Sequence, residues 1–258
     1  MLTVASSSAA VDSPFVSDPG MPTREPLRVP RVDLGAMLRA AADGHFPEPD
    51  GGFSRTAPWR GGVEGAIAFT GHAVMAVTED VTDGELAALG VHGFGGAHDP
   101  RIATTLAGEG PIGVLDALLV GRGTGAGGPL VPRPDLAGTD RAAHAGEWRT
   151  EIDVYGLPDR DVSSLATLSR GIGGLPEVGI QAEDGHAATL LDGILARRPA
   201  GEVVLASVTP GNARSLRFFL RRGFVPVASE QLWKPRRLTR GQASGTAATT
   251  SISTSWPG

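Results

Sequence analysis

Hydrophobic and polar positions near the C-terminal end of the chain follow the pattern of a strand, a helix and a second strand. Val203–Val208 is a short apolar run with β-branched residues, as expected for a buried strand. The turn Pro210-Gly211 follows, and Asn212 then stands where its side chain can cap a helix. The next apolar residues fall at i, i+3 and i+4 on one helical face: Leu216, Phe219 and Leu220. Gly223 can end this helix with positive φ, and Phe224–Leu232 resumes as extended chain.

The segment before this unit shows the same two periodicities. We expect a helix over Asp140–Trp148, a strand over Ile152–Tyr155 and a helix over His186–Arg198. Between them, Ser164–Arg170 and Leu175–Ala182 flank a glycine-rich turn, which predicts a β-hairpin. The predicted order is therefore strand, hairpin, helix, strand, helix, strand.

The first half of the chain predicts a separate mixed α/β block. Its apolar pattern indicates a helix from Val32 or Asp33 to about Asp43. A hairpin follows, with strands over Gly65–Phe69 and Ala73–Thr78. We then expect a short helix over Asp83–Gly90 and a buried strand over Ile112–Val120. The stretch between the first helix and the hairpin, 45–60, is rich in Pro and Gly and is expected to be a loop.

A Gly/Pro-rich stretch divides the two blocks. We expect an N-terminal α/β block over 29–120, a linker over 121–138 and a C-terminal domain over 139–235. The linker contains Gly121, Gly123 and Ala126 in the spacing of a dinucleotide-binding turn, but Pro129 and Pro132 follow where that motif needs a helix. Segments 1–28 and 236–258 lack periodicity and are expected to be disordered.

Composition narrows the classes of function. With 258 residues and 41% hydrophobic residues the chain can bury a substantial core. A net charge of -5 gives no basic footprint for nucleic acid or an anionic membrane, and we expect neither as a partner. The absence of cysteine excludes thiolate catalysis and Cys-ligated zinc. No apolar run approaches the roughly 20 residues of a membrane span, and no signal-peptide pattern occurs, so we expect a cytoplasmic protein.

The C-terminal half resembles the GCN5-related N-acetyltransferases, the GNAT superfamily. The last part of that fold has a strand that ends in Val-x-Pro-x-Asn-x-x-Ser, then a helix, Gly-Phe and another strand. This chain shows a similar pattern, and the matching residues are Asn212, Ser215 and Gly223-Phe224. The resemblance covers about a third of the chain. It implies a mixed α/β fold, α+β-like, with a twisted mixed sheet flanked by helices. The N-terminal block would then be a degenerate second half that shapes the acceptor site.

The resemblance also implies where a coenzyme would bind. In the family, glycines and free N–H groups at a helix N-terminus hold the pyrophosphate of acetyl-CoA. The corresponding loop here runs from Ala182 to Ala187, so Gly185, His186 and Ala187 are the expected contacts, with Asn212 and Ser215 beside them. The loop departs from the family pattern, since Ala182 replaces a basic or amide residue and Glu183-Asp184 adds two negative charges.

For chemistry, the resemblance implies direct attack of an amine on the thioester. Glu177 begins the strand whose opened edge would hold the acyl group, and it is the expected general base, ahead of Asp153 and His186. Backbone N–H groups around Val178 and Ile180 would stabilise the oxyanion. The tyrosine that many relatives use as general acid is replaced by Phe219, which has no proton to donate.

Three functions stay open at this stage. The first is an acyl-CoA-dependent N-acyltransferase, with acetyl-CoA as co-substrate, a small-molecule amine as acceptor and a homodimer as an assembly to test. The second is a pseudoenzyme or binding protein that has lost coenzyme binding, and the third is a biosynthetic enzyme of different chemistry on the same fold. We expect no metal: the His92, His98 and Asp99 group lacks the spacing of a metal site.

Overall fold

The computed structural model describes residues 28–183 and 185–237. The two segments expected to be disordered lie almost entirely outside these residues, as does Asp184 of the expected coenzyme loop.

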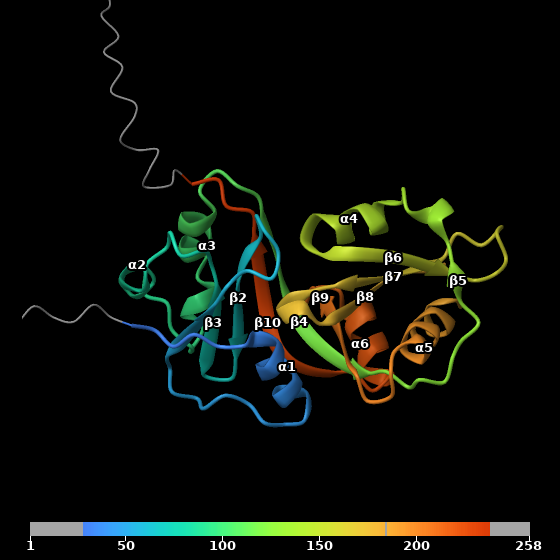
Figure 1. The fold of residues 1–258 in the computed structure, drawn as a ribbon, viewed down its shortest axis with the longest axis horizontal. Helices are drawn as coiled ribbons and strands as arrows, with labels where there is room; N and C mark the ends of the chain where they lie inside the picture. The colour runs from blue at the N-terminus through green and yellow to red at the C-terminus, as the bar shows by residue number, and fades with distance from the viewer. Residues whose placement is uncertain (1–27, 184, 238–258) are drawn as a thin grey trace, which may run out of the picture.

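Ten strands form one continuous mixed sheet that runs the length of the molecule (Figure 1). The strands lie in the order β1-β3-β2-β10-β4-β9-β8-β7-β6-β5. Their bounds are β1 Phe53–Thr56, β2 Glu64–Phe69, β3 His72–Ala76, β4 Ile112–Arg122, β5 Val131–Pro132, β6 Thr150–Gly156, β7 Leu165–Arg170, β8 Pro176–Gln181, β9 Val203–Val208 and β10 Val225–Trp233. Most neighbours are antiparallel, but β1 and β3 are parallel, as are β8 and β9. The predicted mixed α/β class is confirmed.

The two sequence blocks interleave in the middle of this sheet. Strand β4 comes from the first block yet lies between β9 and β10, antiparallel to both. Strand β10, near the C-terminal end, pairs on its other edge with β2 of the first block. Each block therefore completes the sheet of the other, and the division into domains stays a prediction.

Six α-helices flank the sheet within the described residues. They are α1 Leu34–Ala42, α2 Asp83–Ala88, α3 Pro100–Ala107, α4 Asp140–Trp148, α5 Ala187–Arg197 and α6 Ala213–Arg221. In the C-terminal half, α4 lies on one face of the strands and α5 and α6 lie on the other (Figure 1). The face under α5 and α6 carries a large apolar cluster that includes Leu190, Ile194 and Phe219. On the other face, Ala142 of α4 packs with Val154 and Leu165.

The elements expected from periodicity are confirmed, and three others were missed. Helix α4 has the predicted bounds, and α6 is capped by Asn212, whose side chain accepts from the Ser215 N–H at 3.1 Å. The missed elements are α3, the two-residue β5 and β1, which lies inside the stretch expected to be a loop. Strand β1 buries Ser54 and Arg55 instead of apolar residues, so no hydrophobic pattern marks it.

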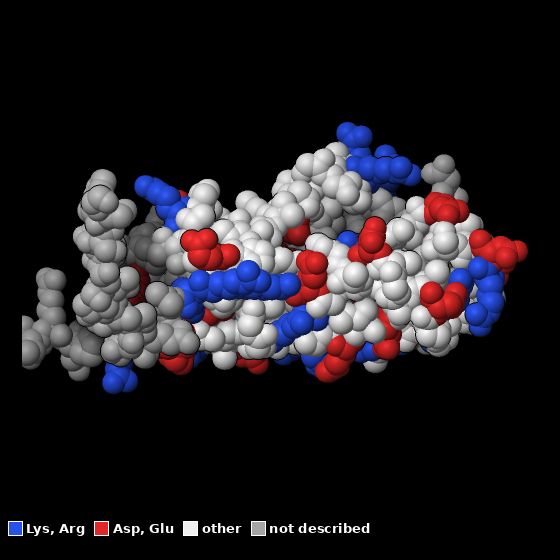
Figure 2. Space-filling view, turned by 90° about the horizontal axis from the view of Figure 1, so that it is seen from above, with Lys and Arg blue, Asp and Glu red and all other residues white. Residues whose placement is uncertain are grey.

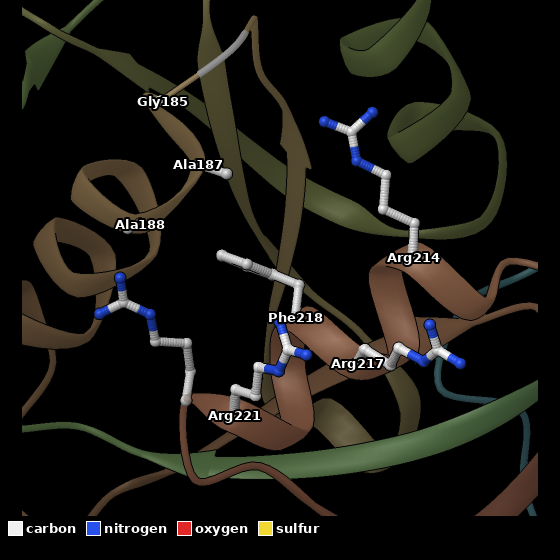
Figure 3. A pocket seen from close by; sticks show the side chains of 8 residues that line it. Gly185, Ala187, Ala188, Arg214, Arg217, Phe218 and Arg221 are labelled. Carbon is white, nitrogen blue, oxygen red and sulfur yellow. The ribbon is translucent and has the colours of Figure 1, made fainter.

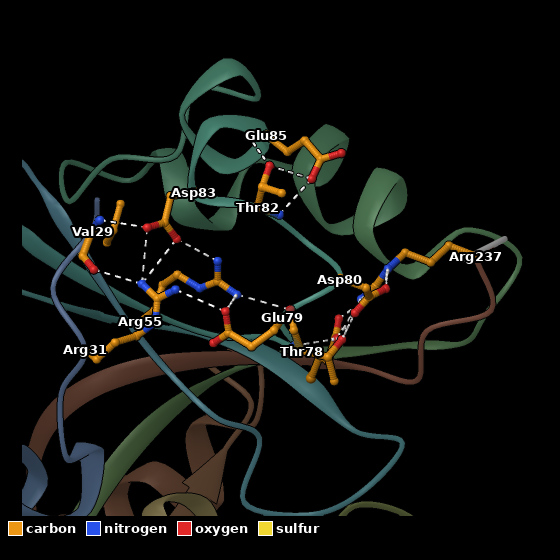
Figure 4. Close-up of polar contacts among 11 residues, drawn as sticks. Val29, Arg31, Arg55, Thr78, Glu79, Asp80, Thr82, Asp83, Glu85 and Arg237 are labelled. Carbon is orange, nitrogen blue, oxygen red and sulfur yellow. Dashed lines mark hydrogen bonds and ion pairs between the residues drawn. The ribbon is translucent and has the colours of Figure 1, made fainter. Parts of the chain in front are cut away.

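A polar network anchors the described N-terminal segment to the first block (Figure 4). The Arg55 side chain is 1% exposed and donates to Asp83 Oδ1 at 2.7 Å and to the Thr78 carbonyl at 3.1 Å. The other Asp83 oxygen accepts from the Val29 N–H at 2.8 Å and from Arg31 at 3.2 Å. Burial opposes ionisation of Asp83, but these hydrogen bonds outweigh it and lower its pKa to about 2.

Candidate functional site

The parallel strands β8 and β9 separate soon after they meet. Their pairing is limited to Glu177 and Leu205 near the start of β8. Past this point a cleft of ≈ 680 Å³ opens, lined by Val178–Gln181 of β8 and Ser207–Thr209 at the end of β9. The lining continues onto β4, onto α4 on one face of the sheet and onto α6 on the other face. The backbone groups of β8 that face β9 therefore border a cleft instead of a neighbouring strand.

A buried ionic cluster closes the inner end of this cleft. Arg149, directly after α4, donates from Nε and Nη2 to the two oxygens of Glu177 at 2.6 and 2.7 Å. Its Nη2 also donates to Glu230 Oε1 at 3.0 Å, and the Ser207 hydroxyl donates to Glu177 at 3.0 Å. Burial disfavours the Arg149 cation, but the two carboxylates outweigh this effect and raise its pKa. The cluster ties α4, β8, β9 and β10 together.

Glu230 is the carboxylate of this cluster that is least well satisfied. It is 2% exposed, and within the described residues its Oε2 accepts no hydrogen bond. Burial raises the pKa of the Glu230 carboxyl to about 7; Arg149 opposes the shift, and Glu177 adds to it. Near neutral pH this group can therefore both release and accept a proton.

Asp116 of β4 is a second carboxylate with a perturbed pKa in the cleft. Its side chain is half-buried and accepts from the Thr209 hydroxyl at 2.7 Å. Burial is the main cause that raises the pKa of Asp116, while the hydrogen bond from Thr209 partly offsets it. Perturbed carboxylates in a concave site are typical of proton-transfer groups.

The cleft brings together most of the site residues expected from the sequence. Five of them line it: Glu177, Val178, Ile180, Asn212 and Ser215. Gly185 and Ala187 line a neighbouring groove. His186 lies at the N-cap of α5, and its Nδ1 is 3.2 Å from the Ser164 hydroxyl. The roles assigned to these residues stay predictions.

The neighbouring groove is basic and lies between the start of α5 and α6 (Figure 3). It measures ≈ 570 Å³ and is lined by Gly185, Ala187, Ala188, Arg214, Arg217, Phe218, Arg221 and Arg222. Arg222 pairs with Asp192 at 2.8 Å. Arg217 and Arg221 make no ion pair with any residue that the structure describes. The glycine turn expected to hold phosphates thus faces arginines supplied by α6.

On the face seen from above, acidic and basic side chains are interspersed (Figure 2). None of the described helices is long and apolar enough to cross a membrane.

Two further groups of polar side chains lie outside the cleft and the basic groove. Asp50, His72 and Ser54 form a hydrogen-bonded chain, with His72 Nδ1 2.8 Å from Asp50 and Nε2 3.1 Å from Ser54 Oγ. Ser54 is 1% exposed, so a substrate carbonyl has no access to its hydroxyl and the chain serves to position β1 and β3. Two members of the His92, His98 and Asp99 group have other partners. His98 Nε2 lies 2.9 Å from Ser229 Oγ, and the Asp99 side chain caps α3. Across residues 28–183 and 185–237, no cluster of three ligating side chains could hold a metal ion.

Comparisons with known proteins give partial structural matches. No model of a known protein family and no curated protein matches the chain. A protein from Novosphingobium aromaticivorans, assigned to the GNAT acetyltransferase family, matches with 17% identity and a TM-score of 0.36 over 49% of this chain and 66% of its own. A Drosophila protein matches with 14% identity and a TM-score of 0.33 over 52% of this chain and 55% of its own. Because both scores are low, we base the fold assignment on the topology of this chain.

The chain has a GNAT-like fold. Strands β8 and β9 are parallel and diverge, α5 follows β8 directly after the glycine turn, and α6 joins β9 to β10. The order of these strands and helices along the chain is the one predicted from the sequence. The N-terminal block extends the same sheet.

Sequence reasoning missed several charged residues of the cleft, among them Asp116, Arg149 and Glu230. Asp116 interrupts the apolar run Ile112–Val120, and an acid in the middle of a strand expected to be buried is a usable signal. Glu230 lies between Ser229 and Gln231 in β10, so its neighbours give no comparable signal. Arg149 follows a helix end, where a basic residue is common, and nothing in its local pattern marks it as buried.

Proposed function

We propose that the protein is an acyl-CoA-dependent N-acyltransferase that works in the cleft between β8 and β9. The observation that carries the proposal is the cleft itself, which opens between two diverging parallel strands and adjoins a glycine turn faced by arginines. A long thiol ester with a phosphorylated end needs both parts, an extended channel beside strand edges and a basic groove at its mouth.

The residues present fit such a co-substrate. The basic groove offers Arg217 and Arg221 to the phosphates, and these cations compensate for the missing basic residue at Ala182. The open edge of β8 offers backbone groups from Val178 to Ile180 to an extended amide-containing arm and to the acyl carbonyl. Asn212 uses its side-chain oxygen to cap α6, which fixes that helix at the boundary of the cleft.

The chemistry requires a neutral amine and a group that removes a proton from it. The amine nitrogen forms a bond to the acyl carbon, the carbon–sulfur bond breaks, and the amine proton passes to a carboxylate of the protein. The departing thiolate takes a proton from water, because Phe219, which has no proton to donate, lines the cleft at the position where many GNAT proteins have a tyrosine. Backbone N–H groups of β8 stabilise the negative charge on the carbonyl oxygen as the intermediate forms.

Asp116 is better suited than Glu177 to accept that proton. Both oxygens of Glu177 already accept hydrogen bonds from Arg149, and one also accepts from Ser207, so neither is free to take the amine proton. Asp116 accepts one hydroxyl hydrogen bond, lines the cleft and has a raised pKa caused by burial. A base with a pKa closer to the working pH is the more effective proton acceptor. We assign Glu177 a structural role, in which it holds Arg149 at the inner end of the cleft.

Release of free thiol from acetyl-CoA tests this function. The protein is incubated with primary amines of different length and charge, and the acylated amine is identified by its mass. We expect saturable release that falls by about 10²-fold or more in Asp116→Asn, the range typical of a lost general base. Release equal to the enzyme-free rate for every amine would contradict the proposal.

A further inference from the structure

Arg141 is a cation in the cleft that the proposed chemistry does not use. It lies in the first turn of α4, is half-buried and lines the cleft. Among the described residues it forms no hydrogen bond or ion pair. Its guanidinium lies against β8 where Gly179 leaves room: a β-carbon on Gly179 would be 3.2 Å from Arg141 Nη1.

The surroundings of Arg141 favour an anion. Burial lowers its pKa, Arg149 contributes in the same direction, and the carboxylates of Glu177 and Asp116 only partly offset these effects. Both Glu177 oxygens are already bound by Arg149, so they do not serve Arg141 as a partner. A partly desolvated guanidinium without a counter-ion is costly, and a carboxylate that enters beside it recovers that cost through charge-assisted hydrogen bonds.

A negative charge lies on another wall of the same cleft. Asp116 projects from β4, whereas Arg141 projects from α4 on the face above the sheet. His144, one helical turn after Arg141, also lines the cleft, and burial and Arg141 lower its pKa, so it stays neutral near pH 7. Besides the paired cluster of Arg149, Glu177 and Glu230, and Glu147, which lies 4.0 Å from His144, the cleft therefore offers the guanidinium of Arg141 and the carboxylate of Asp116 to a bound molecule.

We propose that the acyl acceptor is a zwitterion, an amine that also carries a carboxylate, with Arg141 binding the carboxylate and Asp116 facing the amine. The inference rests on the proposed function and narrows its acceptor to the amino-acid class. The carboxylate could also belong to the acyl group of a dicarboxylic acyl-CoA, and the test separates these two sources.

Ligand-observed NMR titrations test the proposal: small molecules are titrated without any coenzyme, and acetyl-CoA and succinyl-CoA are titrated in separate experiments. The probes are β-alanine, 4-aminobutyrate and 6-aminohexanoate, each with the matching alkylamine and alkanoate. We expect at least one amino acid to bind about 10-fold or more tightly than either matched half, and Arg141→Gln to weaken it by about 10- to 100-fold. The control Arg160→Gln removes the same charge from a side chain that is 77% exposed, and should leave the affinity unchanged.

The outcomes separate the two proposals. Equal binding of amines and amino acids, or an unchanged affinity in Arg141→Gln, overturns the zwitterion assignment and leaves acyl transfer standing. Arg141-dependent binding of succinyl-CoA without binding of amino acids also overturns it. Arg141-dependent binding of an amino acid together with no binding of acetyl-CoA supports this inference while the proposed function fails. Arg141→Lys, which keeps the charge, should retain part of the affinity and confirms that the fold is intact.

Discussion

Arg149 connects four parts of the fold through a single guanidinium. Its hydrogen bonds to Glu177 and Glu230 join β8 and β10 beneath the cleft, and Ser207 adds β9. Buried ion pairs add little net stability when compared with apolar replacements of both partners, but removal of one partner leaves the other charge buried and unpaired. The cluster thus fixes the geometry of the cleft more than it raises stability.

Replacement of Arg149 by Met should therefore destabilise the protein strongly. The variant leaves Glu177 and Glu230 buried together, and we expect the free energy of unfolding to fall by about 3–5 kcal/mol. Urea denaturation measures the loss, and Arg160→Met serves as the matched control because Arg160 is exposed. A loss below about 1 kcal/mol would show that the cluster does not hold the cleft.

Glu230 should make stability depend on pH in a defined window. Its pKa is raised from 4.5 to about 7 in the folded protein, so between these values the folded state binds more protons than the unfolded state. Stability contributed by this group is then lost as the pH rises from about 4.5 to about 7. Relative to Glu230→Gln, the wild type should lose stability across that window in urea denaturation. A difference that is constant with pH would refute the raised pKa.

At the scale of elements, apolar periodicity was sufficient to predict a strand or helix wherever that element buries hydrophobic residues. Strands β7 and β8 and helices α5 and α6 follow their predicted ranges closely, because each buries apolar residues, such as Leu165, Val178, Leu190 and Phe219. Strand β1 escaped prediction since its buried residues, Ser54 and Arg55, are satisfied only by distant partners such as His72 and Asp83. Helix α3 escaped since glycine-rich sequence surrounds it, although Asp99 and Pro100 form a recognisable start.

The first turn of α2 holds the N-terminal segment through Asp83. Replacement of Asp83 by Asn should lower the free energy of unfolding by about 1–3 kcal/mol, because the buried Arg55 loses a charged acceptor. Since the folded pKa is about 2, the contribution is complete above about pH 4 and disappears as the pH falls from about 4 to about 2. Chemical denaturation of both proteins at pH 7 and pH 2.5 measures it. An equal difference at the two pH values would exclude this origin.

At the scale of the whole molecule, the division into two blocks could be predicted but their interleaving could not. Sequence patterns locate β4 and β10, yet pairing partners depend on contacts between residues far apart in the chain. Strand β4 separates β9 from β10, so the C-terminal part lacks its central strand without residues from the first block. Without β4, the cleft would also lack the Asp116 side chain.

Fragments of the chain test this dependence. We expect a fragment of residues 139–237 to lack a cooperative thermal transition, because β9 and β10 would each expose an unpaired edge. A fragment of residues 111–237 restores β4 and should show more cooperative unfolding and native-like circular dichroism. Cooperative unfolding of the shorter fragment alone would mean that β4 is dispensable.

The proposed coenzyme site depends on the basic groove beside the glycine turn, and thermal stability with excess acetyl-CoA tests it most directly. A ligand at about 100 times its dissociation constant adds about 2.7 kcal/mol, or roughly 5–10 °C for a protein of this size. We expect this shift in the wild type and in the control Arg160→Gln/Arg170→Gln, with most of it lost in Arg217→Gln/Arg221→Gln. No shift at millimolar coenzyme, or an equal shift in all three proteins, would contradict the assignment of this groove to the phosphates of acetyl-CoA.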